Sequence, residues 1–326
     1  MQKMSNLKLK EFGLIIFILI AAVFIQFNNS NFMTVGNILN LLNNTSLLGI
    51  MAVGMMGVLL TGGIDLSVGS IVALSGMTSA VINFNYPQIP IVIIILIGML
   101  VGLCSGILVG LLVSKGGVIP IIASLGVMNV LRGLTYIVGN NQWVSAHQMS
   151  PGFKALTTNS FLGIDNLIWI VTGVILLAFY FFNYSRTGRG FYAVGSNMEA
   201  TKITGINKDR ILLTAYSLNG LLCGLVGTLW VSRYASAQGD TAVGYEMNVI
   251  AACVLGGISV SGGEGKVSGL IIGTVMLGIL NNALPLLNVS TFWEDAITGI
   301  IILVAILSNL YLKRNSDKKD LKRRGI

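Results

Sequence analysis

Long apolar runs recur along the whole chain and restrict its fold more than any other feature. A helix needs about 20 apolar residues to cross a hydrocarbon core about 30 Å thick. The runs at 66–83 and 246–261 are short and rich in glycine, so a broken or re-entrant helix is an alternative at each. The sequence predicts an all-α, polytopic transmembrane helical bundle of about ten spans. The predicted spans are residues 12–27, 41–61, 66–83, 89–113, 118–138, 162–183, 211–232, 246–261, 267–286 and 294–312.

The composition excludes an ordinary soluble protein. Of the 326 residues, 54% are hydrophobic and 10% are charged, whereas soluble domains contain about 25% charged residues. The mean hydropathy is +0.83, and the 40 glycines suit membrane helices that pack closely through small residues. We therefore treat residues 1–326 as a single transmembrane domain, although length alone suggests about two soluble domains.

Lysine and arginine predict the orientation of the chain. With a cytoplasmic N-terminus and ten spans, 17 of the 20 basic residues fall in cytoplasmic segments, chiefly the loop 184–210 and the tail 313–326. The exceptions are Arg132, Lys154 and Arg233. This distribution follows the positive-inside rule, predicts that both termini are cytoplasmic and places the basic tail against membrane lipids. The net charge of +8 is thereby explained without nucleic-acid binding.

The first predicted span has an alternative interpretation as a cleaved signal peptide. Lys3, Lys8 and Lys10 precede its apolar stretch, and signal peptides begin with basic residues. However, no small-x-small cleavage site precedes the polar sequence QFNNSNF, and the apolar run is long. We therefore expect an uncleaved first helix.

Cysteine and histidine provide no metal site. Cys104, Cys223 and Cys253 fall inside predicted spans, and their spacing is unlike that of metal ligands, so we expect them to be small packing residues. His147 is the single histidine and lies in an external loop. We expect no metal, no cofactor and no catalytic residue in this chain.

A phosphate-binding loop of the form G-x-x-x-x-G-K-[ST] is also missing from the sequence. The nearest match is SVSGGEGKVSG, in which Val260 replaces the first glycine and Val267 follows Lys266. Energy for transport must therefore come from another polypeptide or from an ion gradient. A stand-alone ion-coupled secondary transporter is the alternative. However, the buried ionisable groups are Asp65 and Arg132, and this is a small number for proton or sodium coupling.

The loop 184–210 contains the signals of a short helix. Ser196 followed by Glu199 predicts a capping box, and Gly205 supplies a left-handed stop. A helix of about two turns is unstable alone in water, so it must contact lipid headgroups as a connector or dock into a cytoplasmic partner. The residues assigned to this helix and its caps are Ser196, Asn197, Glu199, Ala200, Thr201, Ile203 and Gly205.

Glycines recur every four residues in two predicted spans. Gly102, Gly106 and Gly110 form one ladder, and Gly220 and Gly224 form the other. This small-xxx-small pattern lets the backbones of two helices touch. We predict that these glycines serve helix packing rather than ligand contact.

Two glycine-rich segments resemble each other. GGIDLSVGS at 62–70 is similar to GGISVSGGE at 256–264, and both follow an apolar span. Transporters are often built from structural repeats. An internal duplication and a chance match of nine glycine-rich residues are both consistent with this similarity.

The stretch TGGIDLSVGS at 61–70 places one carboxylate, Asp65, between two uncharged apolar runs. We predict that Asp65 accepts hydrogen bonds from the backbone amides of Ser67 and Val68, as the N-cap of the following helix. Irregular backbone at membrane depth must be buried in protein or line a cavity. Asp65 and Ser67 are therefore candidates either for a structural turn in the core or for an inner gate.

Arg132 is the basic residue that lies well inside a predicted span. A charged side chain there costs about 2.5–3.5 kcal/mol on insertion scales, so Arg132 should face protein or water. Asn129 and Tyr136 are three residues before it and four after it, on the same helical face. This polar stripe is a candidate either for the translocation path or for a structural lock between helices.

Six segments of the chain resemble a known family. GIMAVGMMGVLLTGGIDLSVGSIVAL and IPIIASLGVMNVLRGLTYIV are similar to two of its markers, and GRGFYAVGSNMEATKITGIN is similar to its coupling loop. AYSLNGLLCGLVG, GYEMNVIAACVLGGISVSGGEG and GTVMLGILNNALPLLNVSTFW follow in the family's order and spacing. Together they cover roughly residues 35–310 and resemble the permeases of ribose-type sugar ABC importers.

The resemblance implies a permease of the bacterial cytoplasmic (inner) membrane, with the sugar path at the interface with a second copy or a paralogue. Two cytoplasmic ATP-binding subunits would hold the ATP and magnesium, and an extracytoplasmic binding protein would deliver the sugar. The capped helix at 197–204 would be the coupling helix that contacts the ATPase. Family members transport ribose, xylose, arabinose, galactose, rhamnose or autoinducer-2, and VSRYASAQGDTAVGYE is similar to the rhamnose and autoinducer-2 branches.

Overall fold

The computed structural model describes residues 2–290, 293, 296–297, 299–300 and 303. The last predicted span, 294–312, lies almost entirely outside these residues, and the predicted basic tail 313–326 lies wholly outside them.

Helices account for almost all of the regular secondary structure that is described, so the prediction of an all-α fold is confirmed. The helices are α1 (Gln2–Asn28), α2 (Val35–Leu60), α3 (Val68–Asn85), α4 (Ile91–Ser114), α5 (Pro120–Val138), α6 (Pro151–Thr158), α7 (Asn166–Tyr184), α8 (Arg186–Ser196), α9 (Met198–Ile203), α10 (Lys208–Tyr234), α11 (Tyr245–Leu255) and α12 (Val267–Leu286). The strands and the short 3-10 helix are β1 (Val144–Ser145), η1 (Ala146–Gln148), β2 (Ser160–Phe161), β3 (Ile164–Asp165) and β4 (Ser236–Ala237).

Seven of the described helices are long and apolar enough to cross a membrane: α2, α3, α4, α5, α7, α10 and α12. The segment 13–28 of α1 and the helix α11 are shorter apolar helices. These elements fall on the first nine predicted spans, with boundaries shifted by a few residues. A polytopic membrane protein is therefore confirmed, while the total of ten spans and the cytoplasmic position of both termini stay predictions.

α11 is a half-length helix. Its 11 residues give a length of about 17 Å, roughly half of a hydrocarbon core. It is preceded by non-helical residues 238–244. α11 covers only the first part of the predicted span 246–261, and residues 256–261 are non-helical; the sequence offered a broken or re-entrant helix as an alternative for this span.

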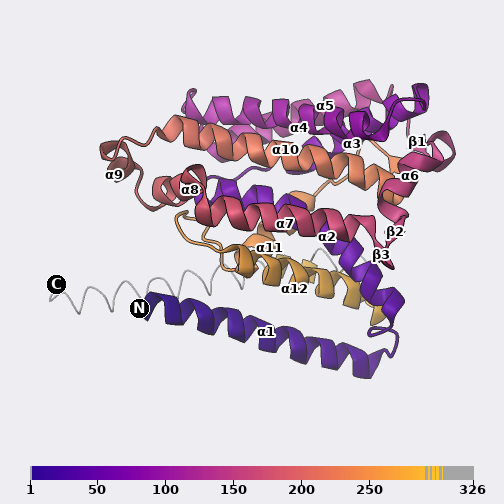
Figure 1. Ribbon diagram of the computed structural model, residues 1–326, viewed down its shortest axis with the longest axis horizontal. Coiled ribbons are helices and arrows are strands. Elements are labelled where there is room, and N and C mark those ends of the chain that lie inside the picture. The colour runs from indigo at the N-terminus through magenta and orange to yellow at the C-terminus, as the bar shows by residue number, and fades with distance from the viewer. Residues whose placement is uncertain (1, 291–292, 294–295, 298, 301–302, 304–326) are drawn as a thin grey trace.

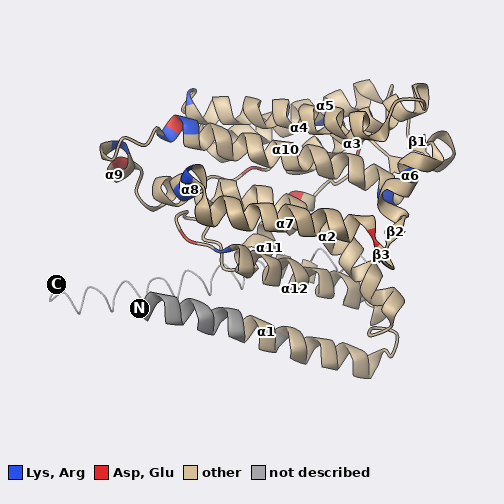
Figure 2. Ribbon diagram, in the orientation of Figure 1, with Lys and Arg blue, Asp and Glu red and all other residues tan. Residues whose placement is uncertain are grey.

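The long helices lie side by side, with small elements at the two ends of the bundle (Figure 1). We refer to the end that carries α8 and α9 as the α9 end, and to the opposite end, with α6 and the strands, as the α6 end. β1 pairs with β4, which ties the loop after α5 to the loop after α10 at the α6 end. Figure 2 shows that lysine and arginine gather around α8, α9 and the start of α10, so the predicted cytoplasmic side corresponds to the α9 end.

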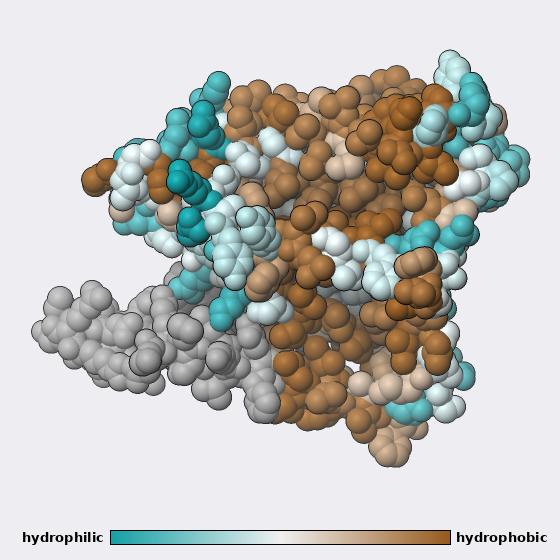
Figure 3. Space-filling model, viewed as in Figure 1, coloured by the Kyte–Doolittle hydropathy of each residue, from teal (hydrophilic) through white to brown (hydrophobic). Residues whose placement is uncertain are grey.

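α2 and α10 form the centre of the bundle. Every residue of α2 from Thr45 to Leu60 is buried, and α10 packs against α4, α3 and α2. In the visible face of the space-filling view, hydrophobic side chains cover the middle of the molecule and hydrophilic ones gather near its two ends (Figure 3). This distribution is expected of a helical bundle whose outer surface contacts lipid tails.

The two predicted glycine ladders face each other across the contact between α4 and α10. A methyl group added at Gly102 would overlap the carbonyl oxygen of Gly220, and one added at Gly220 would overlap that of Gly102. A methyl group at Gly106 would approach the Cα of Gly220 at 3.0 Å, and one at Gly224 would approach that of Gly102 at 3.0 Å. Because these residues have no side chain, the two helix backbones touch directly.

The two similar glycine-rich segments lie next to each other at the end of α2. The amide of Gly263 donates a hydrogen bond of 2.9 Å to the carbonyl oxygen of Leu60. A methyl group at Gly262 would approach the backbone of Gly62 at 2.8 Å and the Cα of Gly195 at 3.0 Å. The end of α8 therefore lies against the end of α2 and the segment 256–264, with close contacts between backbones.

Candidate functional site

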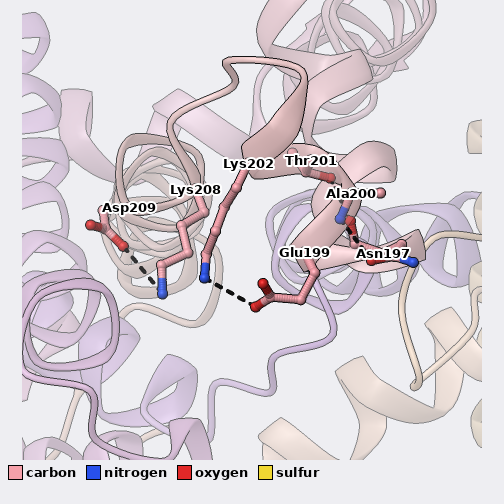
Figure 4. Close-up of polar contacts among 7 residues, drawn as sticks. All are labelled: Asn197, Glu199, Ala200, Thr201, Lys202, Lys208 and Asp209. Atoms are coloured by element: carbon pink, nitrogen blue, oxygen red, sulfur yellow. Dashed lines mark hydrogen bonds and ion pairs between the residues drawn. The ribbon is translucent and has the colours of Figure 1, made fainter.

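α9 is the short helix predicted in the loop 184–210, but its N-terminal cap differs from the prediction. The side-chain oxygen of Asn197 accepts a hydrogen bond of 2.9 Å from the amide of Ala200 (Figure 4). Ser196 is the last residue of α8, whereas Asn197 has the extended backbone of a cap, with φ −161°. The predicted capping box of Ser196 and Glu199 is therefore wrong, because α8 continues through Ser196.

Glu199 makes a local ion pair instead of a cap. Its carboxylate lies 3.0 Å from the ammonium of Lys202, one turn further along α9 (Figure 4). Both side chains are largely exposed, at 80% and 48%. Exposed pairs of this kind contribute little to stability, so Glu199 is not required for the fold of α9.

The C-terminal stop of α9 is the one that the sequence predicts. Gly205 has a left-handed backbone, with φ +78°. Its amide donates to the carbonyl of Lys202 at 3.1 Å, and the amide of Ile206 donates to that of Thr201 at 3.3 Å. These two bonds form a Schellman motif, which satisfies carbonyl groups that the end of a helix leaves unpaired.

α9 presents one side to α8 and an apolar side chain to the outside. The buried hydroxyl of Thr201 donates to the carbonyl oxygen of Ala193 in α8, at 2.9 Å. Ile203, by contrast, is 89% exposed. An isoleucine that protrudes from a polar loop is available for contact with another protein.

α8 fixes the position of α9 relative to the rest of the bundle. The hydroxyl of Tyr192 donates to the carbonyl oxygen of Gly265 at 3.2 Å. Burial raises the pKa of Tyr192 to about 12, so this hydroxyl keeps its proton at any ordinary pH. Gly263 packs against the backbone of Ser196. α8 therefore connects α9 to the glycine-rich segment before α12.

Asp65 is fully buried and joins the turn before α3 to α10. One carboxylate oxygen accepts hydrogen bonds from the amide of Ser67, at 2.9 Å, and from its hydroxyl. The other accepts from the side-chain amide of Asn219, at 2.9 Å. The predicted bond to Ser67 is present, but Val68 is not a partner of Asp65 among the described residues. Ser67, rather than Asp65, is the N-cap residue of α3.

Arg132 reaches from α5 to the non-helical segment between α10 and α11. One guanidinium nitrogen donates to the carbonyl oxygens of Gly239 and Thr241, both at 2.8 Å. The ring of Tyr136 lies against Gly239, where any side chain at residue 239 would overlap it. Two members of the predicted polar stripe thus contact this segment.

Asn129, the third member of the stripe, does not contact the segment. Its side-chain amide donates to the carbonyl of Leu125 in its own helix, at 2.9 Å, and the residue is exposed. Gly126 and Gly133 lie on the same side of α5, and a methyl group added at either would have no atom of this chain within 4 Å. Asn129, Gly126 and Gly133 therefore form an open strip of polar and small residues on α5, beside exposed apolar side chains such as Leu125 and Val130.

Comparison with known proteins identifies the family. Residues 37–306 match the sequence family described as the permease component of branched-chain amino acid transport systems. The chain belongs to this permease family. The ribose import permease protein of Escherichia coli strain K12 is 39% identical over 90% of the permease and 91% of its own length. That of Bacillus subtilis strain 168 is 41% identical over 90% of each chain.

A relative named as an L-arabinose permease is also similar to the permease. The L-arabinose ABC transporter permease protein of Azospirillum brasilense is 36% identical over 93% of the permease and 88% of its own length. No solved structure matches the permease. The resemblance to ribose-type sugar permeases is thus confirmed, and the relatives are transport components rather than enzymes. The permease is a multi-pass protein of the bacterial inner membrane.

The described part of the permease contains no group of three or more His, Cys, Asp or Glu residues that could hold a metal ion. Cys223 and Cys253 are buried free thiols, and Cys104 is an exposed one. His147 lies in the 3-10 helix after β1. None of these residues forms a site with its neighbours in the described structure.

Three contact residues of the permease were not among the sequence-predicted site residues. Asn219 is an amide inside an otherwise apolar run, and that pattern would have marked it as a partner for a buried polar group. Gly239 and Thr241 bind Arg132 through their backbones. Because no side chain takes part, the sequence carries no signal for these two contacts.

Proposed function

We propose that the permease is the membrane subunit of an ABC importer for an aldopentose or a closely related monosaccharide. The ribose and arabinose permeases to which it is 36–41% identical support this substrate class. Rhamnose, xylose and autoinducer-2 are the related solutes that the same assay should include. ATP and magnesium would be bound by two cytoplasmic ATP-binding subunits rather than by this chain.

The open polar side of α5 is the observation that carries this proposal. Asn129 is exposed and Tyr136 is 42% exposed, and Arg132 lies between them in a largely apolar helix. Polar groups at this depth are costly in lipid, so they should face water or protein. We infer that this side of α5 lines the sugar path, at an interface with a second copy of the permease or a paralogue.

α9 would be the coupling helix. Its exposed Ile203 and its two capped ends make it a compact element that a pocket on the ATPase can receive, and the basic residues around it support a cytoplasmic position (Figure 2). An extracytoplasmic sugar-binding protein would then dock at the α6 end. Both termini would be cytoplasmic, and the membrane lipids would surround the apolar belt.

ATP-dependent uptake tests this function. The tagged permease is purified together with the ATP-binding subunit and the binding protein that co-purify with it, and the complex is reconstituted in liposomes with ATP inside and binding protein outside. We expect radiolabelled D-ribose or L-arabinose to accumulate only when ATP is present. Accumulation by the permease alone, driven by a proton or sodium gradient, would show instead that it is a secondary transporter.

A further inference from the structure

Residues 238–244 descend from the α6 end into the bundle without forming a helix. Ala237 lies at the α6 end in β4, whereas the carbonyl oxygen of Ala242 contacts Gly69 near the start of α3. α3 has 18 residues, about 27 Å, and Asn83 near its other end binds the cap of α6. The segment therefore reaches membrane depth, where irregular backbone must be buried in protein or line a cavity.

Contacts with α5 hold this segment in one shape. Arg132 binds the carbonyl oxygens of Gly239 and Thr241, the two neighbours of Asp240, at 2.8 Å each. The amide of Gln238 donates to the hydroxyl of Thr241 at 3.2 Å. The carbonyl groups of both neighbours of Asp240 therefore point toward α5, where one nitrogen of Arg132 binds them. Asp240 itself is exposed.

The carboxylate of Asp240 has no hydrogen bond or ion pair with the residues that the structure describes. Asp65 and Asp165 differ in this respect, because Asp65 binds Asn219 and Asp165 binds Asn43. An unpaired carboxylate inside a membrane is costly unless it meets water or a polar ligand. The guanidinium of Arg132 is close enough to interact electrostatically with the carboxylate of Asp240, but its hydrogen bonds within the described structure go to two backbone carbonyl oxygens.

The groups around Asp240 define the chemistry of a ligand. Asn129 and Tyr136 lie on one face of α5, about 10 Å apart along the helix, with Arg132 between them. An exposed carboxylate accepts hydrogen bonds from neighbouring hydroxyls, an amide both donates and accepts, and an aromatic face packs against C–H groups. This combination suits a neutral polyhydroxylated molecule.

We propose that Asp240, together with Tyr136 and Asn129, forms a sugar-contact site in the wall of the transport path, with Asp240 accepting hydrogen bonds from two sugar hydroxyls. The site rests on the proposed function, and it adds a residue and a segment that the sequence did not indicate. In this arrangement Arg132 is a positioning residue, which shapes the segment through its backbone.

Thiol labelling tests whether Asp240 faces a water-filled, sugar-accessible space. The assembled complex carries Cys104→Ala to remove the exposed native thiol, and then either Asp240→Cys or the control Leu177→Cys. Leu177 is 71% exposed on α7, where we expect lipid. A charged, membrane-impermeant methanethiosulfonate should label Asp240→Cys but not Leu177→Cys, and millimolar D-ribose or L-arabinose should slow the labelling. Equal resistance of both thiols to the reagent would overturn the proposal.

Uptake kinetics test the role of the carboxylate. Removing a hydrogen bond to a charged group should raise the KM for sugar about 10-fold to 100-fold in Asp240→Asn, and Asp240→Glu should restore part of this loss. Val243→Ala is the matched control, because Val243 is 66% exposed in the same segment but has no polar group; its KM should be unchanged. An unchanged KM in Asp240→Asn, or an equal rise in Val243→Ala, would contradict a sugar contact.

These experiments separate the site from the function on which it rests. If the wild-type complex takes up no sugar with ATP, the proposed function fails, whatever the labelling shows. If wild-type uptake is normal but Asp240→Cys is not labelled and Asp240→Asn has a normal KM, only the sugar-contact site fails.

Discussion

Asp65 and Arg132 are charged residues inside the bundle whose hydrogen-bond partners are neutral groups. The carboxylate of Asp65 binds a backbone amide, a hydroxyl and the amide of Asn219. The guanidinium of Arg132 binds two backbone carbonyl oxygens. Breaking either set leaves a charged group with fewer partners in a medium of low polarity, which is more costly than losing a neutral hydrogen bond. Both residues are therefore sensitive points of the structure.

Substitution of Arg132 should show whether this residue is a structural lock or a residue of the translocation path. Arg132→Met would leave the carbonyls of Gly239 and Thr241 without their donor, at about 1–3 kcal/mol for each buried group, and should lower both the melting temperature in detergent and sugar uptake. Asn129→Ala removes only a bond within α5, so its melting temperature should be unchanged while uptake falls. An Arg132→Met protein that melts like the wild type would rule out the lock.

At the scale of single elements, α9 shows what the sequence could and could not predict. Its position, its length and the left-handed stop at Gly205 follow from local signals, and the structure agrees with them. The cap was misplaced by one residue, because Ser196 and Asn197 are both good capping residues. The choice between them depends on how far α8 extends, and α8 is held by Tyr192 and Gly263 through contacts that are distant in the sequence.

The corrected geometry of α9 changes what its variants should do. Glu199→Ala should leave transport normal, because its exposed pair with Lys202 adds little stability. Asn197→Ala should destabilise the helix by about 1 kcal/mol. Ile203→Ala should keep assembly intact in the membrane but reduce sugar-stimulated ATP hydrolysis, because the exposed side chain would be the contact with the ATPase. Normal ATPase stimulation in Ile203→Ala would remove α9 from the coupling role.

At the scale of the whole molecule, the sequence predicts where the helices lie along the chain better than it predicts which distant residues contact one another. Apolar runs locate the spans because lipid requires a helix wherever the chain crosses, and the glycine ladders indicate which helix faces pack closely. No pattern indicates that Arg132 binds a segment 107 residues away, or that Gly263 pairs with Leu60. These contacts depend on how the complete bundle assembles, and they determine where the candidate path lies.

The contact between α4 and α10 should be the point where the bundle is least tolerant of added volume. Gly220→Val would place methyl groups into the carbonyl oxygen of Gly102 and against the backbone of Gly106, so the two helices must separate, at about 1–3 kcal/mol or more. Gly173→Val is the matched control, because Gly173 lies within α7 and has nothing within 4 Å of the added carbon. Both variants make the same change of residue in a long apolar helix, so the difference between their melting temperatures in detergent reports packing alone. We expect a large decrease for Gly220→Val and almost none for Gly173→Val. Equal melting temperatures would mean that α4 and α10 are not held together by their glycines.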